Sequence, residues 1–178
     1  IAPVGGGGLL GALWRGFSEL KALGLCRRIP RLAGVQSAAC LPLVNAIERD
    51  LSPPEVIAHP VEVSATIAGA IADDVLFDAY TAIPAIRTSG GRAVAVTDEQ
   101  MLKAEQLLAR QAGIFAEPSS AATLAALEKL RNAGTITRDD CVCCIITGSG
   151  FKDMACARTL VGPPAAIEPT EEAFLNLA

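Results

Sequence analysis

A run of four glycines, Gly5, Gly6, Gly7 and Gly8, constrains this chain more than any other feature. The run follows a short apolar segment and leads into a stretch whose apolar residues recur every three or four positions, as on one face of a helix. A turn without Cβ atoms lets successive backbone N–H groups converge on an anion, which the N-terminus of the following helix also attracts. The pattern therefore predicts a phosphate-binding turn between a strand and a helix. A flexible leader is the alternative.

A second informative segment, residues 141–146, is an uninterrupted apolar run that leads into Thr147 and Gly148. Such a run, bounded by acidic residues and glycine, predicts a central strand of a parallel sheet with helices on both faces. Thr147 would lie at the carboxyl end of this strand, where α/β sheets bind ligands, and its hydroxyl could form one hydrogen bond there. Capping of a turn by Thr147 is the alternative.

The other segments alternate between predicted strands and helices, which implies an α/β fold with a parallel, largely doubly wound three-layer sheet. Strands are expected at 31–36 and 93–96, helices at 38–49, 79–88, 97–112 and 119–133, and a loop at 51–60. We assign residues 1–160 to one domain and residues 161–178 to a C-terminal extension that ends in a short amphipathic piece at 171–177.

Composition excludes several classes of function. With 178 residues, 51% of them apolar, the chain can bury one substantial core and is too apolar to be disordered. A net charge of −4 without a basic stripe argues against a nucleic-acid partner. The apolar runs are too short and too rich in helix breakers to span a membrane.

The six cysteines predict neither a metal site nor disulfides. Along a strand Cys141 and Cys143 would face one side and Cys144 the other, and no second pair lies at the spacing of a zinc site. We therefore expect buried structural thiols in a protein of the reducing cytoplasm.

Four segments occur in an order that is informative in combination: 4–17 (VGGGGLLGALWRGF), 66–71 (TIAGAI), 113–122 (GIFAEPSSAA) and 146–153 (ITGSGFKD). Together they resemble the C-terminal half of threonine synthase-like enzymes. These enzymes belong to the fold-type-II group that uses pyridoxal 5′-phosphate (PLP), with threonine dehydratase, serine racemase and the tryptophan synthase β chain as relatives. The resemblance covers about residues 2–160. It implies the tryptophan synthase β-like fold, an amino-acid substrate and a homodimer.

The resemblance also implies roles for individual residues. The cofactor phosphate would be bound by Gly5, Gly6, Gly7, Gly8 and the backbone of Leu9. Thr147 would hydrogen-bond the pyridine nitrogen, and a neutral hydroxyl there is associated in this group with β- or γ-elimination or replacement rather than transamination. Glu117 would line the pocket near the ring. Its alternative role is that of an exposed acid at a helix N-terminus.

The lysine that forms a Schiff base with the cofactor lies well before the glycine loop in this group, and here the loop begins at Gly5. None of the lysines of this chain, Lys21, Lys103, Lys129 and Lys152, occupies that position. We therefore expect the cofactor-binding half of a PLP-dependent amino-acid lyase or synthase, inert alone. The first residue, isoleucine, agrees with a fragment or a split protein that pairs with a missing N-terminal half.

Two departures from the resemblance remain. Some dehydratases and racemases hold a metal ion with an acidic residue at the position of Gln36, and the neutral amide predicts no divalent metal site. The missing lysine also leaves an alternative of a different class, a non-catalytic phosphate- or nucleotide-binding α/β module.

Overall fold

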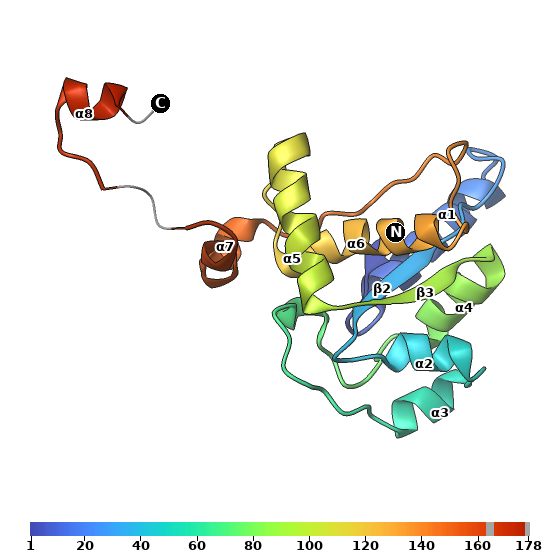
Figure 1. Cartoon of the computed structure of the whole chain (residues 1–178). Helices are drawn as coiled ribbons and strands as arrows, with labels where there is room; N and C mark the ends of the chain where they lie inside the picture. The colour runs from blue at the N-terminus through green and yellow to red at the C-terminus, as the bar shows by residue number, and fades with distance from the viewer. Residues whose placement is uncertain (163–165, 177–178) are drawn as a thin grey trace.

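The computed structural model describes residues 1–162 and 166–176, with three parallel strands at its centre (Figure 1). The strands are β1 (Ala2–Pro3), β2 (Ala33–Ser37) and β3 (Arg92–Val96), in that spatial order. Ala2 pairs with Gly34, and Val35 pairs with Val94. Because the strands are parallel, their carboxyl ends lie at one edge of the sheet, where α/β folds bind ligands.

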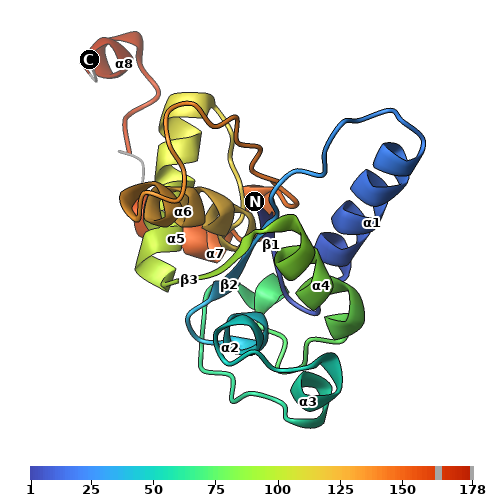
Figure 2. The ribbon, with the colours of Figure 1, turned by 90° about the vertical axis from the view of Figure 1, so that its right-hand side faces the viewer.

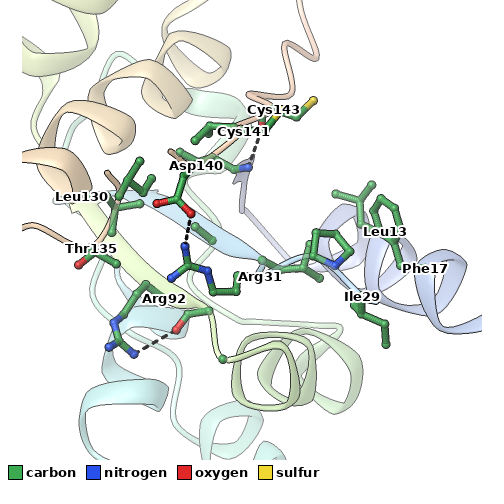
Figure 3. A pocket seen from close by; sticks show the side chains of 18 of the residues that line it. Leu13, Phe17, Ile29, Arg31, Arg92, Leu130, Thr135, Asp140, Cys141 and Cys143 are labelled. Carbon is green, nitrogen blue, oxygen red and sulfur yellow. Dashed lines mark hydrogen bonds and ion pairs between the residues drawn. The ribbon is translucent and has the colours of Figure 1, made fainter. Parts of the chain in front are cut away.

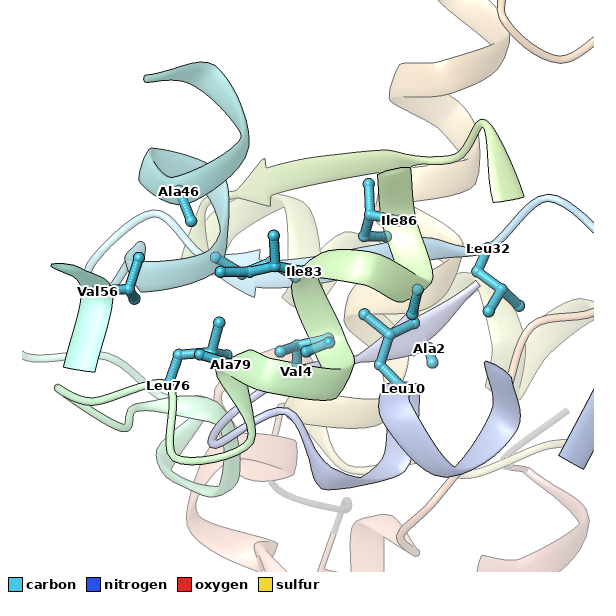
Figure 4. Close-up of a cluster of buried hydrophobic side chains, with 13 residues drawn as sticks. Ala2, Val4, Leu10, Leu32, Ala46, Val56, Leu76, Ala79, Ile83 and Ile86 are labelled. Carbon is cyan, nitrogen blue, oxygen red and sulfur yellow. The ribbon is translucent and has the colours of Figure 1, made fainter. Parts of the chain in front are cut away.

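Helices cover both faces of the sheet (Figure 2). One face carries α1 (Gly8–Ala22), α2 (Pro42–Glu48), α3 (Pro53–Ala58) and α4 (Ala79–Ser89); the other carries α5 (Asp98–Leu107) and α6 (Pro118–Asn132), with α7 (Met154–Leu160) beside α5. Each layer buries its own apolar cluster against the sheet. Leu10, Ile83 and Ile86 belong to the first cluster (Figure 4), and Val35, Val96 and Met101 belong to the second. The predicted three-layer α/β fold is confirmed.

Local signals account for most of the helices. Thr97 forms a capping box with Gln100 at the start of α5, and the predicted helix continues to 112 through a π-helical turn, η2 (Leu108–Ala112). α2 begins at Pro42 rather than at residue 38, because proline suits the first turn of a helix. The predicted loop at 51–60 is wrong in part. A Ser52–Glu55 capping box and two prolines in the first turn start α3 there.

The predicted central strand at 141–146 is wrong, because no strand forms there and the side chains of Cys141 and Cys143 are exposed. The segment does run beside β1: the amine of Ile1 donates to the Cys143 carbonyl at 2.7 Å, and Ile145 N–H donates to the Ile1 carbonyl at 2.9 Å. Pro3 has no N–H with which to continue this pairing. The segment therefore stays extended without becoming a regular strand.

The prediction of buried thiols is correct for only part of the cysteines. Cys141 and Cys143 are exposed because their segment lies outside β1, at the margin of the sheet. Cys40 and Cys156 are buried, and burial raises the pKa of the Cys156 thiol to about 11, which keeps it protonated at neutral pH. All six cysteines are free thiols.

Gln36 has a structural role that the sequence did not reveal. Its side chain is fully buried at the carboxyl half of β2. Oε1 accepts hydrogen bonds from the N–H groups of Leu43 (2.9 Å) and Val44 (3.1 Å), and Nε2 donates to the Val4 carbonyl at 3.4 Å. The amide therefore caps α2 and joins it to Val4, the residue that follows β1. Among residues 1–162 and 166–176, no group of three or more His, Cys, Asp or Glu residues is arranged to hold a metal ion.

The C-terminal residues form a short helix, α8 (Glu171–Leu175), which lies apart from the sheet in both views (Figures 1 and 2). The predicted extension at 161–178 includes residues 163–165 and 177–178, which lie outside the described residues. A domain boundary near residue 160 remains a prediction. None of the helices in the described parts of the chain has the length and apolar character needed to cross a membrane.

The buried carboxyl group of Glu105 predicts that the stability of the fold depends on pH. Its side chain on α5 is 1% exposed, and neither carboxylate oxygen has a hydrogen-bond partner. Burial, with a smaller contribution from Asp153, raises the pKa of Glu105 in the folded protein. A group whose folded pKa is raised stabilises the fold below its unfolded pKa, and this stabilisation is lost as pH rises through the folded pKa.

Replacing Glu105 by glutamine is therefore expected to have little effect at about pH 4 and to raise the free energy of unfolding by about 1–3 kcal/mol at neutral pH. Urea unfolding at several pH values measures this difference. Glu99→Gln is the control, because Glu99 is exposed on the same helix. A Glu105→Gln stability difference that does not grow with pH would contradict the prediction.

Candidate cofactor-binding site

The glycine run forms the turn between β1 and α1 at the carboxyl edge of the sheet. Gly7 precedes the first residue of α1 and has a φ of +98°, a conformation that favours glycine. No side chain caps the N-terminus of this helix. The N–H groups of its first turn, which lack intrahelical acceptors, can therefore bind an anion, and the helix dipole favours one there.

The glycines also allow close contact with the segment that leads into α4. A Cβ on Gly7 would lie 3.0 Å from the Ala82 Cβ and 3.1 Å from the Leu76 Cδ1. The Gly6 carbonyl accepts a hydrogen bond of 2.8 Å from the Asp78 N–H, which ties this segment to the turn. Anion binding is the only reason for these glycines that the sequence pattern indicates. The structure shows that packing against α4 requires them as well.

Thr147 lies at the same edge of the sheet, and Ser120 orients it. Ser120 is fully buried in the first turn of α6, and its Oγ accepts hydrogen bonds from the N–H groups of Thr147 (3.1 Å) and Gly148 (2.8 Å). The hydroxyls of Ser120 and Thr147 are 2.8 Å apart. Because both lone pairs of Ser120 Oγ are occupied, Ser120 donates in this contact, and Thr147 keeps its own O–H for a ligand.

Glu117 lies next to Gly148. Its N–H donates to the Gly148 carbonyl at 3.1 Å, and a Cβ on Gly148 would overlap the Glu117 carboxylate. Glu117 is also the N-cap residue of α6, although its side chain makes no capping hydrogen bond. The N-cap position agrees with the alternative role of an acid at a helix N-terminus. The contact of Glu117 with the cofactor remains a prediction.

The segment at 66–71 forms a further wall of this edge. Thr66 Oγ1 donates to Asp98 Oδ1 at 2.6 Å and lies 2.9 Å from the Ser37 hydroxyl, at the end of β2. The Ile67 N–H donates to Asp98 Oδ2 at 3.1 Å. The segment continues into a short 3-10 helix, η1 (Gly69–Ile71), where the Ala70 carbonyl oxygen would be 3.2 Å from a Cβ on Gly5.

The pairing of Ile1 with residues 143 and 145 relates the two main parts of the candidate site. The pairing is parallel, so both segments run from it toward the carboxyl ends of the strands, one to the glycine turn and the other to Thr147. Thr147 and the glycine turn therefore both lie toward that edge of the sheet. Ser120, Asp73 and Asp78 are not predicted from the sequence. Of these, only Ser120 lies in one of the four segments that carry the family resemblance, 113–122.

A cavity of about 740 Å³ lies at the opposite edge of the sheet (Figure 3). It is lined by residues at the amino ends of the strands, and Arg31 forms an ion pair of 2.8 Å with Asp140 on its wall. None of the residues predicted to bind the cofactor lines this cavity. Parallel sheets bind ligands at their carboxyl ends, so we place the candidate site at the glycine turn.

A doubly wound α/β domain with a glycine turn at a helix N-terminus belongs to the class of proteins that bind phosphorylated ligands at the carboxyl edge of a parallel sheet. Comparison with known families makes the assignment specific. The model of the family described as "Pyridoxal-phosphate dependent enzyme" matches residues 1–148. The chain belongs to this family, whose cofactor is PLP. The resemblance inferred from the sequence is confirmed.

Individual relatives agree with this assignment. A threonine synthase of Methanocaldococcus jannaschii is 41% identical in an alignment of 178 positions that covers 97% of this chain and 39% of that protein. A threonine synthase of Mycobacterium leprae is 39% identical over 151 residues, which cover 85% of this chain and 39% of that protein. The chain thus spans 39% of the length of each of these curated relatives.

Solved structures show the same fold. An L-serine ammonia-lyase of the fungus Rhizomucor miehei has a TM-score of 0.66 at 20% identity, over 83% of this chain and 44% of that chain. A threonine deaminase of T.th. has a TM-score of 0.56 at 27% identity, over 77% of this chain and 41% of that chain. The domain therefore has the architecture of PLP-dependent enzymes that are named for hydroxy amino acids.

Proposed function

We propose that this chain is the cofactor-binding part of a threonine synthase-like enzyme that performs β- or γ-elimination or replacement on an amino acid. The observation that carries the proposal is the glycine turn at the N-terminus of α1, with Gly7 at a φ of +98° and the Thr147 hydroxyl at the same edge. The similarity to two threonine synthases supports the reaction class.

Each residue of the candidate site has a defined task in this proposal. The backbone N–H groups of Gly5, Gly6, Gly7, Gly8 and Leu9 hold the cofactor phosphate. Thr147 donates its free O–H to the pyridine nitrogen, and Ser120 fixes the direction of that donor. Glu117 lines the pocket beside Gly148. PLP, when bound, supplies an electron sink, and a neutral donor at the ring nitrogen makes that sink weaker than a carboxylate would.

A lysine from outside this chain completes the proposal. Lys103 lies 3.7 Å from the Glu128 carboxylate, and Lys129 Nζ donates to the Ala95 carbonyl at 2.7 Å. Lys21 is in the last turn of α1, at the opposite end of that helix from the glycine turn. Lys152 ends the 3-10 helix η3 (Gly150–Lys152), which follows Thr147. None of the four lysines has the position before the glycine loop that the Schiff-base lysine of this group occupies, and we therefore propose that residues 1–178 alone are catalytically inert. The active form is a homodimer, or this chain joined to a further segment of the protein, and it works in the cytoplasm.

Reduction of the PLP-bound complete protein with borohydride, followed by peptide mapping, tests this proposal. We expect one labelled lysine outside residues 1–178 and no specific label when the chain is treated alone. A label on Lys21, Lys103, Lys129 or Lys152 would refute the assignment of the lysine. A complete protein that binds phosphate but acquires no label on any lysine would instead support the non-catalytic binding module.

A further inference from the structure

Two carboxylates border the glycine turn, on the segment between η1 and α4. Asp73 Oδ2 would lie 2.5 Å from a Cβ on Gly5 and 3.4 Å from a Cβ on Gly6. Asp78 Oδ2 would lie 2.9 Å from a Cβ on Gly8. These oxygens therefore approach three of the four glycines to which the proposed function assigns the cofactor phosphate. Two negatively charged groups therefore lie beside a turn that is proposed to bind an anion.

The backbone keeps both residues in place. The Asp78 N–H donates to the Gly6 carbonyl at 2.8 Å, and the Asp73 carbonyl accepts a hydrogen bond from the Cys40 thiol. In residues 1–162 and 166–176, none of the lysine or arginine side chains forms an ion pair with Asp73, Asp74 or Asp78. The negative charge beside the turn is therefore held there without a compensating cation among these residues.

We propose that Asp73 and Asp78 are affinity-determining residues that weaken the binding of the PLP phosphate at the glycine turn. This inference rests on the proposed function, in which the turn holds that phosphate. A phosphate carries a charge of about −1.5 to −2 near neutral pH, and like charges at this range repel each other. The helix dipole and the backbone donors attract the phosphate, while the two carboxylates oppose part of that attraction.

The test is the double substitution Asp73→Asn with Asp78→Asn in the complete protein. Asparagine keeps the shape of the side chain and remains a good N-cap residue for α4, so the fold should be retained. Titration of the apo-protein should show PLP binding about tenfold tighter than in the unmodified protein at low ionic strength. The gain should shrink as salt screens the charges. Pyridoxal, which lacks the phosphate, should bind with unchanged affinity.

Asp139→Asn is the matched control, because Asp139 lies on the cavity at the opposite edge of the sheet and should change neither affinity. Unchanged or weaker PLP binding by the double variant would overturn the inference. An equal gain for pyridoxal would also overturn it, because the phosphate would not be the group that senses the charges. If pyridoxal binds the unmodified protein as tightly as PLP does, the glycine turn is not the phosphate site, and the proposed function itself fails.

Discussion

Replacement of Gly7 by valine is expected to destabilise the fold and to abolish tight PLP binding. Gly7 has a φ of +98°, and a branched side chain in such a conformation costs about 1–3 kcal/mol. The added atoms would also press on the Ala82 Cβ at 3.0 Å and the Leu76 Cδ1 at 3.1 Å, which adds about 1–3 kcal/mol. Urea unfolding and PLP titration of the apo-protein measure the two effects.

Gly16→Val is the matched control for this substitution. Gly16 lies in the same helix, and a Cβ there would meet no heavy atom within 4 Å. Its replacement should change the free energy of unfolding by less than about 0.5 kcal/mol and leave PLP affinity intact. A Gly7 variant as stable as the Gly16 variant, with unchanged PLP affinity, would show that the turn neither needs glycine nor binds the phosphate.

Ser120→Ala is expected to have the second largest effect. The substitution leaves the N–H groups of Thr147 and Gly148 without their acceptor, at a cost of about 1–3 kcal/mol for each group that stays buried. Thr147 also loses the donor that directs its hydroxyl. We therefore expect lower stability together with weaker PLP binding and slower turnover. Removal of the Thr147 hydroxyl alone should weaken the free energy of PLP binding by about 1 kcal/mol, the value of one hydrogen bond.

Ser119→Ala provides the control, since Ser119 is the preceding residue of α6 and is also buried. Within the described residues its side chain makes no hydrogen bond comparable to the three of Ser120. This variant should bind PLP as the unmodified protein does. Equal behaviour of the two serine variants would remove Ser120 from the support of the site.

The predictions that succeeded depended on signals carried by neighbouring residues. The apolar periodicity after the glycine run predicted α1, and the Thr97 cap predicted the start of α5. The short apolar run at 93–96 predicted β3 to within one residue. These signals are local, because capping and helix or strand periodicity require only a few consecutive residues.

The predictions that failed depended on contacts between distant segments. The run at 141–146 has the composition of a buried strand, but its position beyond β1 and the missing N–H of Pro3 leave it irregular and partly exposed. By its residue type alone, Gln36 indicates only a poor metal ligand. Its hydrogen bonds to the start of α2 and to Val4 cannot be recognised without the folded chain.

The sequence by itself therefore determined the alternation of strands and helices, the three-layer class, and the glycine turn at the start of α1, because propensity and capping act over a few residues. Only the tertiary structure decided what surrounds the turn. Asp73 and Asp78 meet the glycines, and Ser120 meets Thr147, across chain separations that no local pattern encodes. Folding alone brings these groups together, since the parallel sheet gathers the carboxyl ends of its strands at one edge.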